Sequence, residues 1–321
     1  MTRSRRLFGA ALGVATLLSA VAPSAQIHGD GAVISYRVFA PTEPVQAGAL
    51  VEFGPSFSLR SSRWLSGHVL SARVPVTGRV TVVAELPVAY REYELSPEQE
   101  ARYAEIVAGP LGGQETYAPL TRRDAALGVG NPLLGAEVTL TERLSVEAGV
   151  RVPLGGRRDG GLAATRFNPP DVVGRAADPV RDEAYATGTV SLAAGVRFSR
   201  PVGRHLAVAG FATSLLSVLG AEVARGPVDA SSQRASSRAS LAGVWGGSAE
   251  ALAGPIALGV HVAGRIDPTP VWRSAPSAPL STGASLRLRS GPVRPAVMYQ
   301  RFVAGRARGG AVSVGLEVPL R

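Results

Sequence analysis

The chain has 321 residues, 45% of them hydrophobic, with 38 glycines, a composition that fits a sheet-rich protein better than a helical one. It contains no cysteine, which excludes disulfides, thiolate metal sites and cysteine nucleophiles, and no metal or other cofactor is expected. The formal net charge is +10 and every basic residue is arginine. Because these arginines are scattered, without a basic helix or an aromatic stacking surface, no nucleic-acid partner is expected.

The N-terminus has the order of a secretory signal peptide, which we predict over residues 1–25. Three arginines within residues 3–6 precede an apolar run over Leu7–Ala22, and small residues follow. The run is shorter than about 20 residues and stops at Pro23, so we interpret it as cleaved rather than as a membrane span. No other continuous apolar stretch of about 18 residues follows. A closed barrel is then the remaining way to cross a membrane.

Residues 26–45 are predicted to be a periplasmic lead-in or plug, in which the short apolar piece Ala32–Phe39 could form a small strand. From residue 46 to 321 apolar and polar residues alternate with a period of two, which is typical of strands. The runs are roughly 10 to 14 residues long, against about 5 to 6 in soluble sheets. About twelve strands are predicted, at Ala47–Arg60, Leu65–Val76, Arg79–Arg91, Ala125–Leu140, Leu144–Leu154, Tyr185–Ser199, Arg204–Leu219, Ser240–Leu252, Pro255–Ile266, Thr282–Ser290, Val293–Val303 and Gly310–Leu320.

The connections between these strands differ in length in a regular way. Long links at about 92–124, 155–184, 220–239 and 267–281 alternate with short turns such as 141–143 and 253–254. Outer-membrane barrels have short periplasmic turns and long extracellular loops. The predicted fold is therefore an all-β transmembrane antiparallel barrel of about twelve strands, exported to the cell outer membrane, with its lipids and lipopolysaccharide as partners.

Alternation also predicts which side chains face the lumen. In the last strand Val312 and Val314 would meet lipid while Ser313 and Glu317 face inward. An arginine facing lipid at mid-membrane would cost about 2 to 4 kcal/mol, so charges are expected inside. The pore-lining candidates are Glu52, Arg73, Glu85, Arg91, Glu137, Glu147, Arg151, Arg197, Glu250, His261, Arg265, Arg287, Arg289 and Glu317.

These inward charges allow two interpretations. Arginines and glutamates of neighbouring strands could pair with each other and fill a narrow interior. Alternatively, part of the set could line a pathway in which the excess of arginine favours anions or carboxylates. The arginine bias itself could reflect a positive pore, contacts with lipid phosphates, or only the codon preference of the genome.

One stretch resembles a known family. The order Gly128-Val129-Gly130-Asn131-Pro132, then Leu134-Gly135-Ala136-Glu137, then Glu147-Ala148-Gly149-Val150-Arg151-Val152-Pro153-Leu154-Gly155 is similar to the central hairpin of outer-membrane transporters linked to the meta-cleavage pathway of phenol degradation. That family shares its general character with the hydrophobic-solute channels typified by long-chain fatty-acid transporters. The resemblance implies a monomeric barrel for passive uptake of small, often aromatic or apolar, solutes.

Other functions remain as alternatives: a general anion-preferring porin, a structural or adhesive barrel, or a membrane-embedded lipid-modifying enzyme. An enzyme needs a nucleophile or activated water beside a base, typically a histidine with an orienting acid. The histidines are His28, His68, His205 and His261, and no surrounding pattern marks any of them. His68 is predicted to face lipid, where a Ser–His pair could meet a phospholipid. We expect no enzymatic activity, and the lack of cysteine and of a spaced His pair argues against a metal site.

Overall fold

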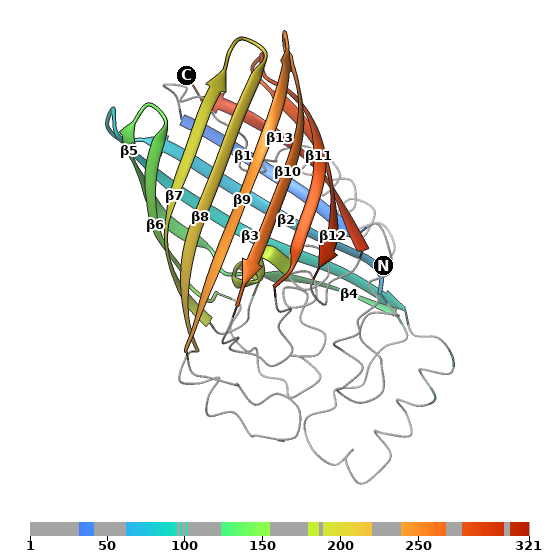
Figure 1. Ribbon diagram of the computed structural model, residues 1–321. Helices are drawn as coiled ribbons and strands as arrows, with labels where there is room; N and C mark the ends of the chain where they lie inside the picture. Colours follow the sequence, from blue (N-terminus) through green and yellow to red (C-terminus); the bar gives the residue numbers. More distant parts are fainter. Residues whose placement is uncertain are drawn as a thin grey trace.

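The computed structural model is nearly all β (Figure 1). It describes residues 32–41, 62–94, 97, 101, 123–154, 179–185, 189–219, 239–267, 278–304 and 309–320. No helix among these residues is long and apolar enough to cross a membrane. The elements are β1 (Ala32–Pro41), β2 (Ser62–Pro75), β3 (Val80–Glu94), β4 (Arg123–Val129), β5 (Leu133–Thr141), β6 (Leu144–Arg151), the 3-10 helix η1 (Pro179–Ala184), β7 (Thr189–Val202), β8 (Leu206–Leu219), β9 (Ala239–Ala253), β10 (Ile256–Ile266), β11 (Leu280–Leu288), β12 (Arg294–Ala304) and β13 (Gly309–Leu320).

The described strands close into an antiparallel barrel, which confirms the predicted fold class. Their order is β2-β1-β13-β12-β11-β10-β9-β8-β7-β6-β5-β3-β4, and an additional pairing of β2 with β3 completes the ring. At the seam the first strand pairs with the last, from Ala32 opposite Leu320 to Pro41 opposite Ala311. Twelve strands thus form the wall, and β4 is an extra strand beside β3.

The two faces of the wall differ as alternation predicts. On β10, Leu258 and Val260 are 56% and 61% exposed, whereas Ala257, which precedes them, is 1% exposed. On β13, Val312 and Val314 are exposed, whereas Ser313 and Glu317 are buried. Large apolar side chains therefore cover the outside of the barrel and charged ones lie inside. Soluble monomers rarely expose contiguous apolar surface on this scale, but a lipid-facing barrel does.

The short turns were predicted at the correct places. The β2–β3 connection spans residues 76–79 and the β5–β6 connection spans residues 142–143. In each turn a threonine hydroxyl accepts backbone N–H bonds from the two residues that follow the tip: Thr77 from Arg79 and Val80, at 3.2 and 3.0 Å, and Thr141 from Arg143 and Leu144, at 3.2 and 3.1 Å. Local side-chain hydrogen bonds of this kind stabilise turns without any long-range contact, which is why sequence indicates them well.

The wall begins earlier than predicted. Residues 26–45 were interpreted as a lead-in or plug and the barrel as starting at residue 46, but β1 is a full member of the ring, paired on both edges. Its alternation is short, and Arg37 in its centre interrupts the apolar pattern; that side chain is buried on the inner face. The predicted strand Ala47–Arg60 and the signal peptide at 1–25 lie outside the described residues.

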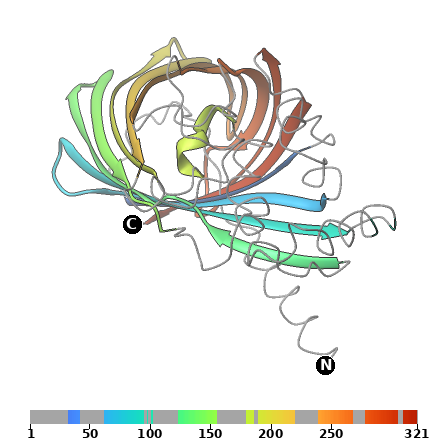
Figure 2. The ribbon, with the colours of Figure 1, turned by 90° about the horizontal axis from the view of Figure 1, so that it is seen from below.

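The segment predicted as one strand, Ala125–Leu140, is two strands separated by residues 130–132. Both β4 and β5 pair with the same edge of β3. Pro132 has no N–H group, and neither has Pro87 on the facing strand, so the hydrogen-bond ladder cannot run unbroken through this point. Gly130 instead donates to the Pro87 carbonyl at 2.9 Å. Beyond the break, β4 follows β3 away from the ring (Figure 2).

Adding a methyl group at this break should destabilise the barrel. A Cβ at Gly130 would overlap the backbone carbonyl oxygen of Ala184, which cannot move away as a flexible side chain would. We expect Gly130→Ala to lower the free energy of unfolding by about 1 to 3 kcal/mol, measured by denaturant titration in lipid vesicles. The matched control is Gly78→Ala, because a Cβ at Gly78 would meet no atom within 4 Å. Equal stability of the two variants would contradict the tight contact.

Candidate functional site

The candidate site lies in the lumen, where η1 is enclosed by the ring of strands (Figure 2). The break in the wall holds one end of this helix. Asn131 is buried, its backbone N–H donates to the Ala184 carbonyl at 2.7 Å, and its side-chain amide donates to the Glu183 carbonyl at 3.0 Å. The Gly130-Asn131-Pro132 sequence therefore ends the regular ladder and supplies hydrogen bonds to the helix inside.

Ion pairs fix the charged side chains of η1 to the wall. The Arg181 guanidinium donates to both carboxylate oxygens of Glu85 on β3, at 2.7 and 3.0 Å. Glu183 accepts from Arg265 on β10 at 2.7 Å, and its carboxylate lies 3.9 Å from the guanidinium of Arg151 on β6. Arg151 also reaches Glu85 at 2.5 Å. The helix is thus linked to both sides of the barrel.

Apolar contacts complete this attachment. At one end of η1, Val180 packs with Leu215 and Val244 on β8 and β9. At the other end, Ala184 and Tyr185 join a buried cluster with Phe39, Leu65, Val69 and Ala89, from β1, β2 and β3. The rings of Phe39 and Tyr185 meet edge to face, with centroids 6.1 Å apart. A six-residue helix has little stability of its own, so these contacts with the wall hold its place.

Several polar contacts in the lumen pass over an intervening strand. They are Arg73 (β2) with Glu137 (β5), Arg151 (β6) with Glu85 (β3), Arg287 (β11) with Glu250 (β9), and Thr213 (β8) with Glu147 (β6). In two of these contacts, Arg287 with Glu250 and Thr213 with Glu147, the intervening strand has a glycine at the crossing point. A Cβ at Gly259 on β10 would overlap Ser285 Oγ and press on Glu250, and one at Gly195 on β7 would overlap Thr213 Oγ1. Adjacent strands contribute Arg197 with Glu147 at 2.5 Å and Arg294 with Glu317 at 2.9 Å.

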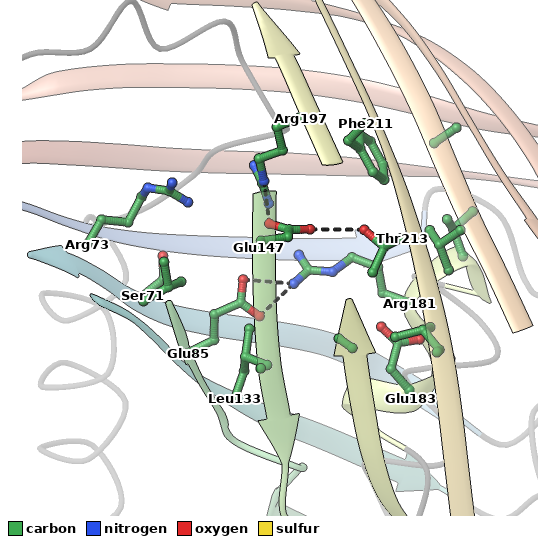
Figure 3. Close-up of a pocket in the computed structure, with 18 of the residues that line it drawn as sticks. Ser71, Arg73, Glu85, Leu133, Glu147, Arg181, Glu183, Arg197, Phe211 and Thr213 are labelled. Carbon is green, nitrogen blue, oxygen red and sulfur yellow. Dashed lines mark hydrogen bonds and ion pairs between the residues drawn. The ribbon is translucent and has the colours of Figure 1, made fainter. Parts of the chain in front are cut away.

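A cavity of about 230 Å³ lies beside η1 and has two unlike sides (Figure 3). One side is apolar and consists chiefly of Phe211, Leu215 and Val244, with Val180 of the helix. The other side is charged; the residues there that face the cavity include Arg73, Glu85, Glu147, Arg181 and Arg197. A solute in this space would meet hydrocarbon along one flank and hydrogen-bonding charges along the other.

In each of three ion pairs at the cavity the arginine is more exposed than its carboxylate partner. The side-chain exposures are 25% for Arg73 against 7% for Glu137, 27% for Arg181 against 17% for Glu85, and 34% for Arg197 against 20% for Glu147. The carboxylates lie deeper, towards the wall, and the guanidinium groups cover them. In these three pairs the more exposed charge is positive, whereas in the Arg151–Glu85 pair the carboxylate is the more exposed, 17% against 6%.

Most predicted pore-lining residues do face inward. Arg73, Glu85, Glu147, Arg151, Arg197 and His261 line the cavity, and Glu137, Glu250, Arg265, Arg287 and Glu317 form ion pairs in the interior. Arg289 follows the end of β11, where its backbone N–H donates to the Pro255 carbonyl at 2.7 Å. Glu52 and the side chain of Arg91 lie outside the described part of the protein. The pairing of arginines with glutamates is thus observed, and part of the same set lines a cavity; a solute pathway that favours anions stays a prediction.

Sequence reasoning missed the cavity residues Arg37, Arg181 and Glu183. Arg37 lies in the segment interpreted as a lead-in, and the other two lie in a connection that was interpreted as a loop. In Arg181 and Glu183 a signal was present, because three charged residues, 181–183, stand between Val180 and the apolar pair Ala184–Tyr185. That pattern is too short to show a helical period, so it could not be told from an ordinary loop.

His68, considered above for an enzymatic alternative, belongs to a hydrogen-bonded set on the outward face. Its Nδ1 lies 2.7 Å from the Tyr36 hydroxyl and its Nε2 lies 3.1 Å from the Ser66 hydroxyl. Ser66 and His68 are both buried. The set satisfies its own polar groups within the wall.

These features define a closed transmembrane β-barrel of the outer-membrane type, with a short helix and an amphipathic cavity in its lumen. The solved structure of an outer-membrane channel from Pseudomonas putida F1 is similar, with a TM-score of 0.54 and 10% identity over 94% of this chain and 100% of that one. Two weaker likenesses have lower TM-scores. The CymD monoaromatic hydrocarbon channel has a TM-score of 0.43 and 12% identity over 92% of this chain and 80% of that one. The KdgM porin in complex with disordered oligogalacturonate has a TM-score of 0.41 and 7% identity over 90% of this chain and 99% of that one.

At such low identity the likeness shows the shared fold. It supports the resemblance inferred from residues 128–155 at the level of the outer-membrane barrel fold, and it does not extend to the transporters of phenol degradation. No protein-family model matches the sequence, and no curated protein is significantly similar to it.

Proposed function

We propose that the protein is an outer-membrane channel for the passive uptake of small solutes with aromatic or apolar character. The observation that carries this proposal is the cavity in the lumen, apolar on one side and hydrogen-bonding on the other, inside a wall whose outer face is apolar. Such a site can take a solute out of water and still let it leave, because conduction needs binding that is favourable but weak.

The position of η1 favours a selective channel over a wide pore. The helix is attached to opposite sides of the wall, so an open aqueous column of full barrel width is not available beside it. The protein is proposed to act as a monomer in the outer-membrane lipids, after export by the signal peptide at residues 1–25. No step of this transport needs a cofactor or a chemical reaction.

The test is reconstitution of the refolded full chain in planar bilayers and liposomes. Small-ion conductance is compared with the uptake of aromatic compounds, fatty acids and sugars of similar size. Faster uptake of the aromatic or apolar members, with little ion conductance, is the expected result. Large anion-preferring conductance would favour the general porin, for which the exposed arginines are the supporting observation. If no solute crosses, the channel proposal fails and a structural or adhesive role takes its place.

A further inference from the structure

The cavity has the dimensions of a small ring compound. Its volume is about 230 Å³. An apolar protein cavity of about 150 Å³ is enough to hold benzene. A single six-membered ring with one or two small polar substituents is therefore of a size that this space can hold.

The apolar side offers a flat surface for such a ring. Phe211 on β8 stands beside Leu215, and both belong to a cluster with Val244 on β9. A Cβ at Gly246, the residue opposite Phe211 on β9, would overlap the phenyl ring, so the glycine lets that ring lie close to the wall. Aromatic rings pack on one another in offset or edge-on geometry with a gain beyond simple burial.

The charged side has an excess of positive charge. Its described residues include five arginines, Arg37, Arg73, Arg151, Arg181 and Arg197, against three glutamates, Glu85, Glu147 and Glu183. Glu137 does not line the cavity, but it pairs with Arg73. The arginines still outnumber the glutamates when Glu137 is included. A bound anion would balance this excess.

Two of these arginines line the cavity around Glu147. Arg197 on β7 is paired with Glu147 at 2.5 Å, and Arg73 on β2 points toward the same part of the cavity (Figure 3). Their guanidinium groups remain partly exposed after pairing, as described above. A carboxylate between two guanidinium groups would accept charge-assisted hydrogen bonds from each and relieve their mutual repulsion.

His261 supplies an independent sign of a missing ligand. It lines the cavity from β10, and both of its ring nitrogens are buried without a hydrogen-bond partner in the described structure. Its ring lies over Gly283 on β11, where any side chain would collide with it. Leaving buried polar atoms unsatisfied is costly, and a neutral imidazole offers one donor and one acceptor to a solute hydroxyl.

We propose that the lumenal cavity binds a monocyclic aromatic carboxylate, with the carboxylate between Arg73 and Arg197, the ring against Phe211, and a ring hydroxyl on His261. This inference rests on the proposed channel function and names its solute class. In this site Arg197 recognises the negative charge of the solute and Phe211 recognises its aromatic ring. His261 distinguishes hydroxylated rings from rings without a hydroxyl group.

The test is calorimetric titration of the full chain in lipid nanodiscs with benzoate, its neutral analogue benzamide, and acetate, which lacks the ring. Benzoate should bind at least about tenfold more tightly than either, since hydrogen bonds to charged groups and ring burial each contribute on that scale. Equal dissociation constants for benzoate and benzamide, or no saturable benzoate binding, would overturn the inference. With 4-hydroxybenzoate the affinity should rise, and His261→Phe should abolish only that rise.

Substitutions distinguish a loss of ligand binding from a loss of barrel stability. Arg197→Gln should weaken benzoate binding at least about tenfold and leave benzamide unchanged, and Arg197→Lys should restore part of the loss. The matched control is Arg294→Gln, which removes an equally exposed arginine (34%) from a strand-to-strand pair away from the described cavity lining. If both Gln variants lower benzoate affinity equally, the effect is structural and the site is wrong.

Flux into liposomes that contain the same protein variants keeps the two proposals distinct. Saturable benzoate binding with no flux of any solute supports the site and contradicts the channel. Flux of aromatic and apolar solutes with no preference for the carboxylate supports the channel and contradicts the site. Uptake of benzoate that saturates, and that falls in Arg197→Gln but not in Arg294→Gln, supports both.

Discussion

Replacing Val260 by arginine should lower the free energy of unfolding in a lipid bilayer by about 2 to 4 kcal/mol. Val260 is 61% exposed, points outward and stands near the middle of β10, where a guanidinium group would face hydrocarbon. The measurement is reversible folding into vesicles of defined lipid, followed by denaturant titration. In a detergent micelle, which adapts its shape, the same change should cost much less.

The control for depth is Leu320→Arg. Leu320 is also exposed and outward-facing, but it is the last residue of β13, where an arginine can reach the interface and the cost falls to about 0 to 1 kcal/mol. A clear difference between the two variants places the apolar outer face in lipid. If both variants unfold at the same denaturant concentration as the unchanged protein, the outer face is not in the membrane.

Glu183→Ala should raise the small-ion conductance of the barrel. Glu183 is buried and accepts the ion pair from Arg265, with Arg151 at 3.9 Å, so its loss leaves positive charge uncompensated beside η1. Breaking a buried pair on one side costs about 3 to 5 kcal/mol, which exceeds what a six-residue helix can recover by itself. We expect small-ion conductance to rise several-fold in planar bilayers, with frequent switching between levels.

Glu317→Ala tests whether this effect is specific to the helix. Glu317 is also a buried glutamate, and it is paired with Arg294. That pair joins β12 to β13 and does not involve η1. Its conductance should stay near that of the unchanged protein while its stability falls. Equal increases in the two variants would mean that the helix does not restrict the lumen.

The strands were predictable where the chain repeats a local pattern. The hairpin around residues 142–143 was located correctly because Val146 and Glu147, and their neighbours, alternate strictly and a threonine marks the turn. Alternation does not report breaks in pairing, so the division of β4 from β5 was missed. That division depends on Pro87 of β3 lying opposite Gly130, next to the Asn131-Pro132 break, and these segments are distant in sequence.

The site was predictable as a set of inward charges and not as a geometry. The alternation of inward and outward side chains identifies Glu85 and Arg151 as lumen-facing. Only the order of strands in the barrel shows that the two residues pair across β5. The place of η1 was beyond sequence reasoning for the same reason: Arg181 and Glu183 have their partners on β3, β6 and β10, and no local pattern encodes which strands will stand opposite a connection.

The seam between β1 and β13 has a consequence for the order of biogenesis. It joins Ile34 to Val318, almost the whole chain apart, whereas the neighbouring hairpins form from local contacts. Bringing such distant segments together carries the largest loop-closure entropy, so the seam closes after the hairpins. Until then β1, which is synthesised first, has an unpaired edge that must be kept from wrong partners. Phe39 of β1 also packs on Tyr185 beside η1, so sealing the wall and seating the helix become one final step of assembly.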